Sequence, residues 1–306
     1  MKLFIKAIGL VALLALCPSV GSAAPTVVRS AETRTHGFLT LKNEHGEILA
    51  DGELLQAPRH DIMESRMVFR FKDGSLYDEM VTFSQHGVFR LLSYRLVQHG
   101  KSLPPSETFF DRHTWRYRAR SDSGDEERTE GRLDPPEDIH NGITGILVKN
   151  IPSGSHANGH LLAFTPKPRL LKSEFRAESA DEYFVGGVAH TATRFLIKLD
   201  IGGFAGMVAG VLGKTPPDLR YWITTGPAPT FVKFEGAMFL NGPRWRIELS
   251  APRWAADRRL GNSLEELRSL RGAHVETFVA ILTEDGISEH SDRMRTTTDR
   301  GDSGRL

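Results

Sequence analysis

The chain has 306 residues, with 39 Lys and Arg residues against 38 Asp and Glu residues and a formal net charge of +1. A charge this close to neutral creates no strong field for a polyanion, so we expect no nucleic-acid partner. The only cysteine, Cys17, lies in an N-terminal leader. The rest of the chain therefore has no disulfide, no thiolate metal site and no cysteine nucleophile.

Residues 1–23 have the three-part layout of a cleavable signal peptide. Lys2 and Lys6 supply the positive start, residues 8–16 form an apolar core, and Gly21-Ser22-Ala23 offers small residues to a signal peptidase. The apolar core is far shorter than the ~20 residues of a spanning helix. Cleavage after Ala23 removes two of the 39 basic residues and leaves 37 against 38 acidic ones, a net charge of −1. We expect export to the periplasm or cell envelope, or secretion.

Alternating polar and apolar residues predict strands throughout residues 33–254, which we take as the main domain. The clearest hairpin joins residues 67–71 to residues 77–83 through Asp73-Gly74, because this pair tolerates the positive φ of a tight turn. Further strands are expected up to residue 250. The pattern is typical of an antiparallel β-meander.

One helix is predicted over residues 137–149, where Ile139, Ile143, Ile146 and Leu147 fall on one face at helical spacing. The expected fold is mainly β: an antiparallel β-roll or half-barrel of about ten strands around this helix.

Residues 255–287 predict a short helical tail. Ser263 and Glu266 fit a capping box, and leucines continue at helical spacing. Packing against the domain and binding of a partner both remain open for this tail. Residues 288–306 are polar and charged with very few apolar residues, which indicates disorder.

The sequence segments that resemble catalytic or cofactor-binding motifs match these motifs only in part. Residues 210–215 resemble the end of a phosphate-binding loop, but Val208 stands where the motif needs glycine. Residues 301–304 match the core of a trypsin-like nucleophile loop, yet only two residues follow them. Asp78 and Glu79 are neighbours in a strand, so their carboxylates point to opposite faces. We expect no cofactor, no metal and, on balance, no enzyme.

The most unusual segment is the glycine-rich, apolar stretch of residues 201–213. As a helix it would be about 20 Å long, too short to span a bilayer. It could be a buried connection, a loop in peripheral contact with a membrane, or a lid over an apolar cavity. The residues that we expect to bind an apolar ligand are Phe204, Met207, Val211 and Trp222.

Six blocks of the main domain carry a resemblance to known proteins: His36-Gly37-Phe38, Ala50-Asp51-Gly52-Glu53, Phe71-Lys72-Asp73-Gly74-Ser75, Phe83-Ser84-Gln85, Thr165-Pro166-Lys167-Pro168-Arg169 and Gly242-Pro243-Arg244-Trp245-Arg246-Ile247-Glu248-Leu249. Together they resemble an uncharacterised family of exported Gram-negative proteins of acidobacterial type. The strand layout is also similar to envelope β-roll domains of unknown function with a lipid-carrier-like shape. Neither resemblance implies an activity or a catalytic set, and both cover about residues 36–254.

Three functional hypotheses follow from the sequence. The first is an exported envelope protein whose curved sheet binds an apolar or lipid ligand. The second is a structural or assembly factor that acts through protein partners. The third is an envelope hydrolase whose acid and base are scattered along the chain, and a cavity with two convergent carboxylates or a His–carboxylate pair would favour it.

Overall fold

Antiparallel strands make up most of the computed structural model, which describes residues 24–122, 126–165, 167–185, 188–200, 218–239 and 242–250. The chain divides into two units, Met1–Ala251 and Pro252–Leu306, and every described residue belongs to the first. The predicted signal peptide and both predicted tail segments lie outside the described residues.

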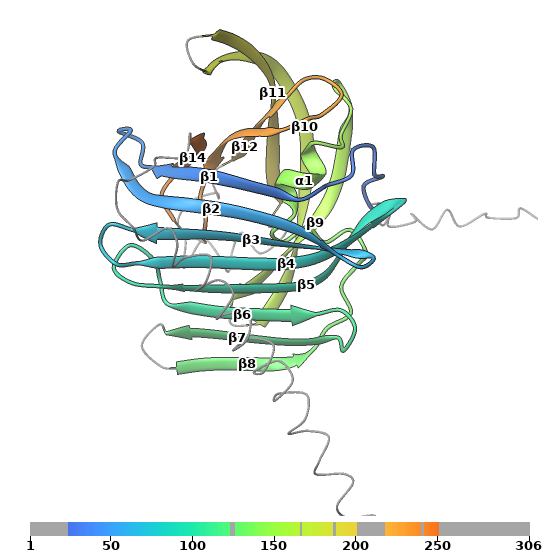
Figure 1. Cartoon of the computed structure of the whole chain (residues 1–306). Helices are drawn as coiled ribbons and strands as arrows, with labels where there is room; N and C mark the ends of the chain where they lie inside the picture. Colours follow the sequence, from blue (N-terminus) through green and yellow to red (C-terminus); the bar gives the residue numbers. More distant parts are fainter. Residues whose placement is uncertain are drawn as a thin grey trace, which may run out of the picture. The chain divides into compact units, whose positions relative to one another are not determined.

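The strands, shown in Figure 1, are β1 (Thr35–Lys42), β2 (Ile48–Arg59), β3 (Ile62–Phe71), β4 (Leu76–His86), β5 (Val88–His99), β6 (Ser106–Asp111), β7 (Arg116–Asp122), β8 (Glu126–Arg132), β9 (His156–Thr165), β10 (Lys167–Val185), β11 (Val188–Asp200), β12 (Leu219–Thr224), β13 (Phe231–Gly236) and β14 (Trp245–Ser250).

All fourteen strands form one sheet in the order β8-β7-β6-β5-β4-β3-β2-β1-β14-β13-β12-β11-β10-β9. Every strand pairs antiparallel with its neighbours in that order, and β1 pairs with β14. The end strands β8 and β9 are not paired with each other, so the sheet is open. The rings of Tyr117 in β7 and Phe164 in β9 nevertheless lie 6.1 Å apart. The sheet therefore curves until strands near its two ends meet.

The mainly β, antiparallel prediction is confirmed, and so is the hairpin at Asp73-Gly74. Gly74 has φ of +85°, and the Asp73 carboxylate accepts a hydrogen bond from the backbone N–H of Ser75. The predicted number of about ten strands is wrong, because the described part of the chain alone forms fourteen. Charged strands such as β8, with the sequence EERTEGR, lack the apolar alternation by which strands are recognised.

The predicted helix is also much shorter than expected, so a roll wrapped around a helix of residues 137–149 is not supported. Only Thr144–Val148 is helical, as α1. Residues 138–140 instead run parallel to β9: His140 N–H donates to the carbonyl of His160, and His160 N–H donates to that of Asp138. Gly142, with φ of +67°, turns the chain between this extended piece and α1.

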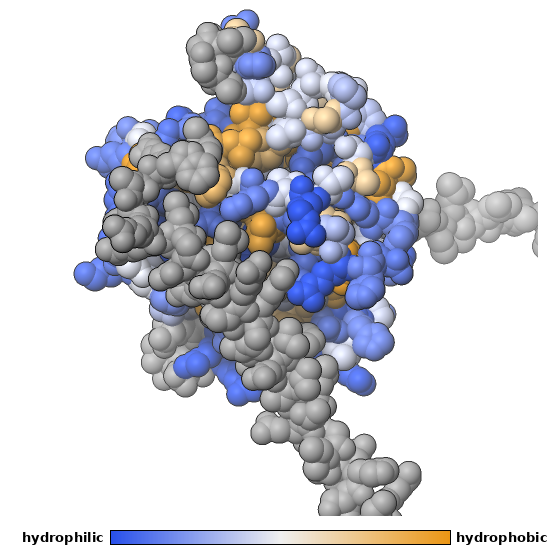
Figure 2. All heavy atoms as spheres, in the orientation of Figure 1, coloured by the Kyte–Doolittle hydropathy of each residue, from blue (hydrophilic) through white to orange (hydrophobic). Residues whose placement is uncertain are grey.

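Two clusters of buried apolar side chains form the core, and both lie on one face of the sheet, called here the inner face. The first joins β3–β6 to the α1 region and to β9–β12, and the second joins β1–β4 to β13 and β14. In Figure 2, hydrophilic residues predominate on the visible side and apolar residues form separate orange patches. Four side chains contact both clusters and are only partly buried: Leu96, Leu219, Tyr221 and Phe231.

Candidate functional site

One row of residues on the inner face, where the two core clusters meet, stays partly accessible. Leu54 on β2 lies opposite Met67 on β3, Met67 opposite Glu79 on β4, and Glu79 opposite Leu96 on β5. All four residues keep accessible surface. We call them the inner strip. Four strands spaced about 4.8 Å apart give it a length of roughly 14 Å.

The rows of residues on either side of the inner strip are buried. Residues two positions away along each strand point to the same face, so they lie directly beside the strip. All of them are buried, with exposed fractions of 0% for Phe69 and 2% for Val81. The four side chains of the inner strip therefore keep surface that their neighbours on the sheet do not cover. The flanking residues are Gly52, Phe69, Tyr77 and Gln98 on one side, and Gln56, Ser65, Val81 and Tyr94 on the other.

The connection from β8 to β9 packs closely against β4 at the same place. Gly142 lies over Glu79 and Val81 and is exposed, although its neighbours Asn141 and Ile143 are buried. A Cβ atom built on Gly142 would lie 3.3 Å from Cδ of Glu79 and would overlap Val81. A residue larger than glycine would therefore collide with β4 beside Glu79.

Glu79 is the polar group of the inner strip. It lies deep among protein atoms, and burial raises the pKa of its carboxyl from 4.5 to about 7. The Tyr77 hydroxyl donates to Glu79 Oε1 at 3.2 Å, and the Tyr94 hydroxyl also hydrogen-bonds this carboxyl. Within the described ranges, Glu79 has no ion pair. A carboxyl in apolar surroundings with a pKa near neutral can bind a ligand by charge or by hydrogen bond.

Asp78 points to the opposite face, as the sequence predicts. Its carboxylate accepts two hydrogen bonds from the Arg66 guanidinium, at 2.8 and 2.6 Å. This pair raises the pKa of Arg66, chiefly through the hydrogen bond. The two adjacent acids thus cannot act together as an acid–base pair.

A second polar group lies where the β8–β9 connection packs against β9 and β10. His140 Nε2 is 2.7 Å from Ser173 Oγ, and His140 Nδ1 is 2.8 Å from Thr144 Oγ1. Next to it, His160 Nδ1 lies 2.8 Å from Oδ1 of Asp138. No sequence motif links these residues, because the partners are up to 33 positions apart.

This buried group has the residue types of a hydrolase site but not its access. Ser173 is 2% exposed and His140 is 1% exposed, so a substrate carbonyl has no path to the serine oxygen. Burial also lowers the pKa of His140 to about 3, which keeps the imidazole neutral. The contacts instead fasten the connection to β9 and β10. Nowhere in the described residues do three His, Cys, Asp or Glu side chains converge as metal ligands would.

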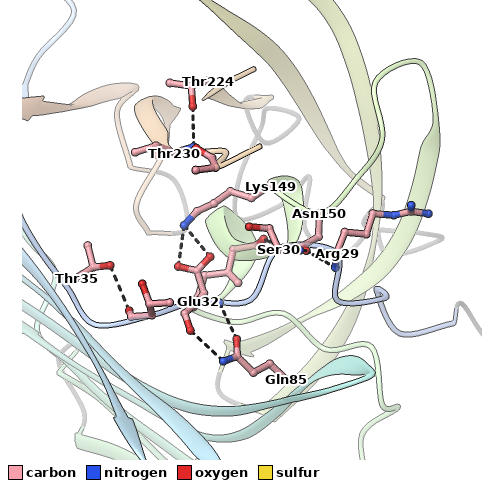
Figure 3. Close-up of polar contacts among 12 residues, drawn as sticks. Arg29, Ser30, Glu32, Thr35, Gln85, Lys149, Asn150, Thr224 and Thr230 are labelled. Atoms are coloured by element: carbon pink, nitrogen blue, oxygen red, sulfur yellow. Dashed lines mark hydrogen bonds and ion pairs between the residues drawn. The ribbon is translucent and has the colours of Figure 1, made fainter. Parts of the chain in front are cut away.

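A pocket of about 240 Å³ lies beside the end of α1, near the residues of Figure 3. Lys149 Nζ donates to both carboxylate oxygens of Glu32 at 2.8 Å. Asn150 Oδ1 accepts the backbone N–H groups of Arg29 and Ser30. The volume is below the roughly 300–1,000 Å³ of ordinary ligand sites. These contacts anchor the segment before β1 and leave the inner strip as the candidate site.

Three of the residues predicted to bind a ligand, Phe204, Met207 and Val211, lie outside the described residues. Trp222 lies in β12, and its neighbours Tyr221 and Ile223 face the inner core. Its own side chain is on the outer face, where Nε1 donates to Asp181 at 2.8 Å and Lys233 Nζ lies 3.6 Å from the ring centroid. Trp222 therefore does not line the inner strip. The sequence analysis did not predict the inner strip as a site.

Comparisons with known proteins give the chain no family. No family model matches it, and no curated protein does. Among solved structures, it is similar to a beta-barrel-like protein of domain of unknown function DUF1849 from Brucella abortus, with a TM-score of 0.41 and 6% sequence identity. The match covers 72% of this chain and 100% of that one. The resemblance to exported acidobacterial-type proteins stays a prediction.

The described residues include no helix with the length and apolar character that crossing a bilayer requires.

Proposed function

We propose that this chain is an exported envelope protein that binds an apolar or amphiphilic ligand in the inner strip. The observation that carries this proposal is the partly accessible row of Leu54, Met67, Glu79 and Leu96 between two rows of buried residues. Three apolar side chains and a single carboxyl match the usual composition of small-molecule sites, which are mostly apolar with a few placed polar groups.

The expected affinity is moderate. Removing a twelve-carbon chain from water contributes on the order of 10 kcal/mol, at ~0.8 kcal/mol for each buried CH₂. Association costs about 4 kcal/mol or more in lost translational and rotational freedom. The balance corresponds to dissociation constants of roughly tens of micromolar.

The direct test uses the same substitution on the two faces of the sheet. Met67→Trp fills the inner strip, whereas Met80→Trp places an identical ring on the outer face, where Met80 lies opposite Arg66. Titration with dodecanol should show binding to the native protein and to Met80→Trp, and a loss of at least about tenfold in Met67→Trp. Equal affinity in both variants, or no binding by the native protein, would refute the site.

Export is supported by the signal-peptide layout of residues 1–23. Expression of the full chain in a Gram-negative host should yield a periplasmic protein whose first residue is Ala24. An intact N-terminus in the cytoplasmic fraction would contradict this part of the proposal.

A further inference from the structure

Among the residues that the structure describes, no cation balances the charge of the Glu79 carboxyl. The described titratable groups that face it from the packed elements are Tyr77 of β4, Tyr94 of β5 and Tyr221 of β12, all neutral hydroxyls. Met67 of β3 and Gly142 of the β8–β9 connection face it without a titratable group.

The charged side chain next to Glu79 in the sequence lies on the outer face of the sheet. Asp78, the neighbour of Glu79, is bound to Arg66 there through two hydrogen bonds. In the part of the chain that the structure describes, Glu79 therefore has tyrosine donors but no basic partner. A deep carboxylate without a counter-charge is costly, and a cation supplied from outside the chain would remove that cost.

The tyrosine hydroxyls suit a cationic guest. Burial raises the pKa values of Tyr77, Tyr94 and Tyr221, so each hydroxyl stays protonated at physiological pH. A phenol oxygen that donates its hydrogen to a carboxylate can still accept a hydrogen bond. An ammonium group has three donors and no acceptor, so it can bind the carboxylate and the phenol oxygens together.

We propose that the inner strip binds an amphiphile with a cationic amine head, which pairs with Glu79 and the surrounding tyrosine hydroxyls while its tail covers Leu54, Met67 and Leu96. This inference rests on the proposed function and names its ligand class. An anionic head would face like-charge repulsion from Glu79. A neutral alcohol would gain the tail contacts alone.

The pairing has a defined pH dependence. An alkylamine stays protonated below about pH 10, whereas Glu79 loses its proton as the pH rises through about 7. The amine affinity should therefore rise between pH 5.5 and pH 8. Dodecanol affinity should not rise over that range.

The test compares three ligands with the same twelve-carbon tail, all below their micelle-forming concentrations: dodecylamine, dodecanol and dodecanoate. At pH 8 the native protein should bind dodecylamine at least about tenfold more tightly than dodecanol, as for a charge-assisted hydrogen bond in a buried site. Dodecanoate should bind most weakly. Butylamine, which has the head without the tail, should not bind at millimolar concentration, and this separates an amphiphile from a free amine.

Two variants test whether the preference for dodecylamine over dodecanol depends on Glu79, and a third variant controls for the loss of one negative charge. Glu79→Gln should bring dodecylamine to within about threefold of dodecanol. Met67→Lys, which places a protein ammonium opposite Glu79, should also abolish the preference while keeping the carboxyl. Glu53→Gln removes a negative charge from the outer face of β2, beside His36, and should leave the preference unchanged.

Dodecanoate binding as tightly as dodecylamine, or an amine preference that survives Glu79→Gln, would overturn the inference. In either case, continued binding of dodecanol would leave the proposed function standing. If none of the three ligands bound to the native protein, both would fail.

Discussion

The two faces of β4 place adjacent carboxyl groups in opposite electrostatic situations. On the outer face, Asp78 is 7% exposed and is paired with Arg66 through two short hydrogen bonds. On the inner face, Glu79 is deep, partly accessible and surrounded by tyrosines. The outer charge is paired within the fold, whereas the inner carboxyl has no basic partner among the described residues, and the proposed ligand site rests on this difference.

Removing the outer acid should give the largest loss of stability. Asp78→Ala leaves the Arg66 guanidinium without its two hydrogen bonds, and breaking a buried ion pair costs about 3–5 kcal/mol. Chemical denaturation should show a loss of this size. The control is Glu107→Ala, because Glu107 lies 3.8 Å from Arg95 and its side chain is 48% exposed. The loss of stability in Glu107→Ala should stay below about 1 kcal/mol. Equal losses in the two variants would show that the Asp78–Arg66 pair contributes no more than an exposed ion pair.

The inner acid should make the apo protein less stable as the pH rises. The folded-state pKa of Glu79 is about 7, above the ordinary 4.5, so the folded chain holds this proton more tightly than the unfolded chain does. Its contribution to the free energy of unfolding is full below about pH 4.5 and is lost as the pH rises through 7. The loss corresponds to ~3 kcal/mol.

Denaturation of the native protein and of Glu79→Gln between pH 4 and pH 8.5 isolates this contribution, because all other groups titrate in both proteins. The variant should become the more stable of the two above pH 7. A constant difference across the range would show that Glu79 has an ordinary pKa.

A smaller loss of stability is expected from a substitution at Gly142, where the β8–β9 connection packs against β4. Gly142→Ala should lower the free energy of unfolding by about 2 kcal/mol, from the strain of positive φ and the overlap with Val81. Gly154→Ala is the matched control, since Gly154 has φ of +77° and open space around its Cβ position. It should cost only about 1 kcal/mol. Dodecanol binding should weaken only in Gly142→Ala, and equal binding by both variants would place the ligand elsewhere.

Local patterns predict some of this arrangement and miss the rest for identifiable reasons. Alternation assigns Asp78 and Glu79 to opposite faces, and Asp-Gly predicts the turn before them. The α1 region is mispredicted because Asp138 and Ile139 add to the edge of β9, a contact between segments about 20 residues apart. Helical spacing of apolar residues cannot reveal such a long-range pairing.

The residues of the inner strip are neighbours only because of the register in which strands β2 to β5 pair. Leu54, Met67, Glu79 and Leu96 come from four strands, and each strand shows only that the residue faces inward. Which inward row keeps accessible surface also depends on the segments packed against it, such as the β8–β9 connection at Gly142. Local sequence patterns predict Trp222 and residues 201–213 as the site because aromatic and glycine-rich segments are visible in a short stretch of sequence, whereas a row of residues across four strands is not.

Methyl NMR of the methionines during a dodecylamine titration at pH 8 tests the central claim most directly. Met67 lies in the inner strip, and Met80 lies on the other face of the neighbouring strand. We expect the Met67 methyl resonance to shift with saturation at one equivalent while the Met80 resonance stays in place. A Met67 resonance that does not move, or that moves no more than the Met80 resonance, would contradict binding in the inner strip.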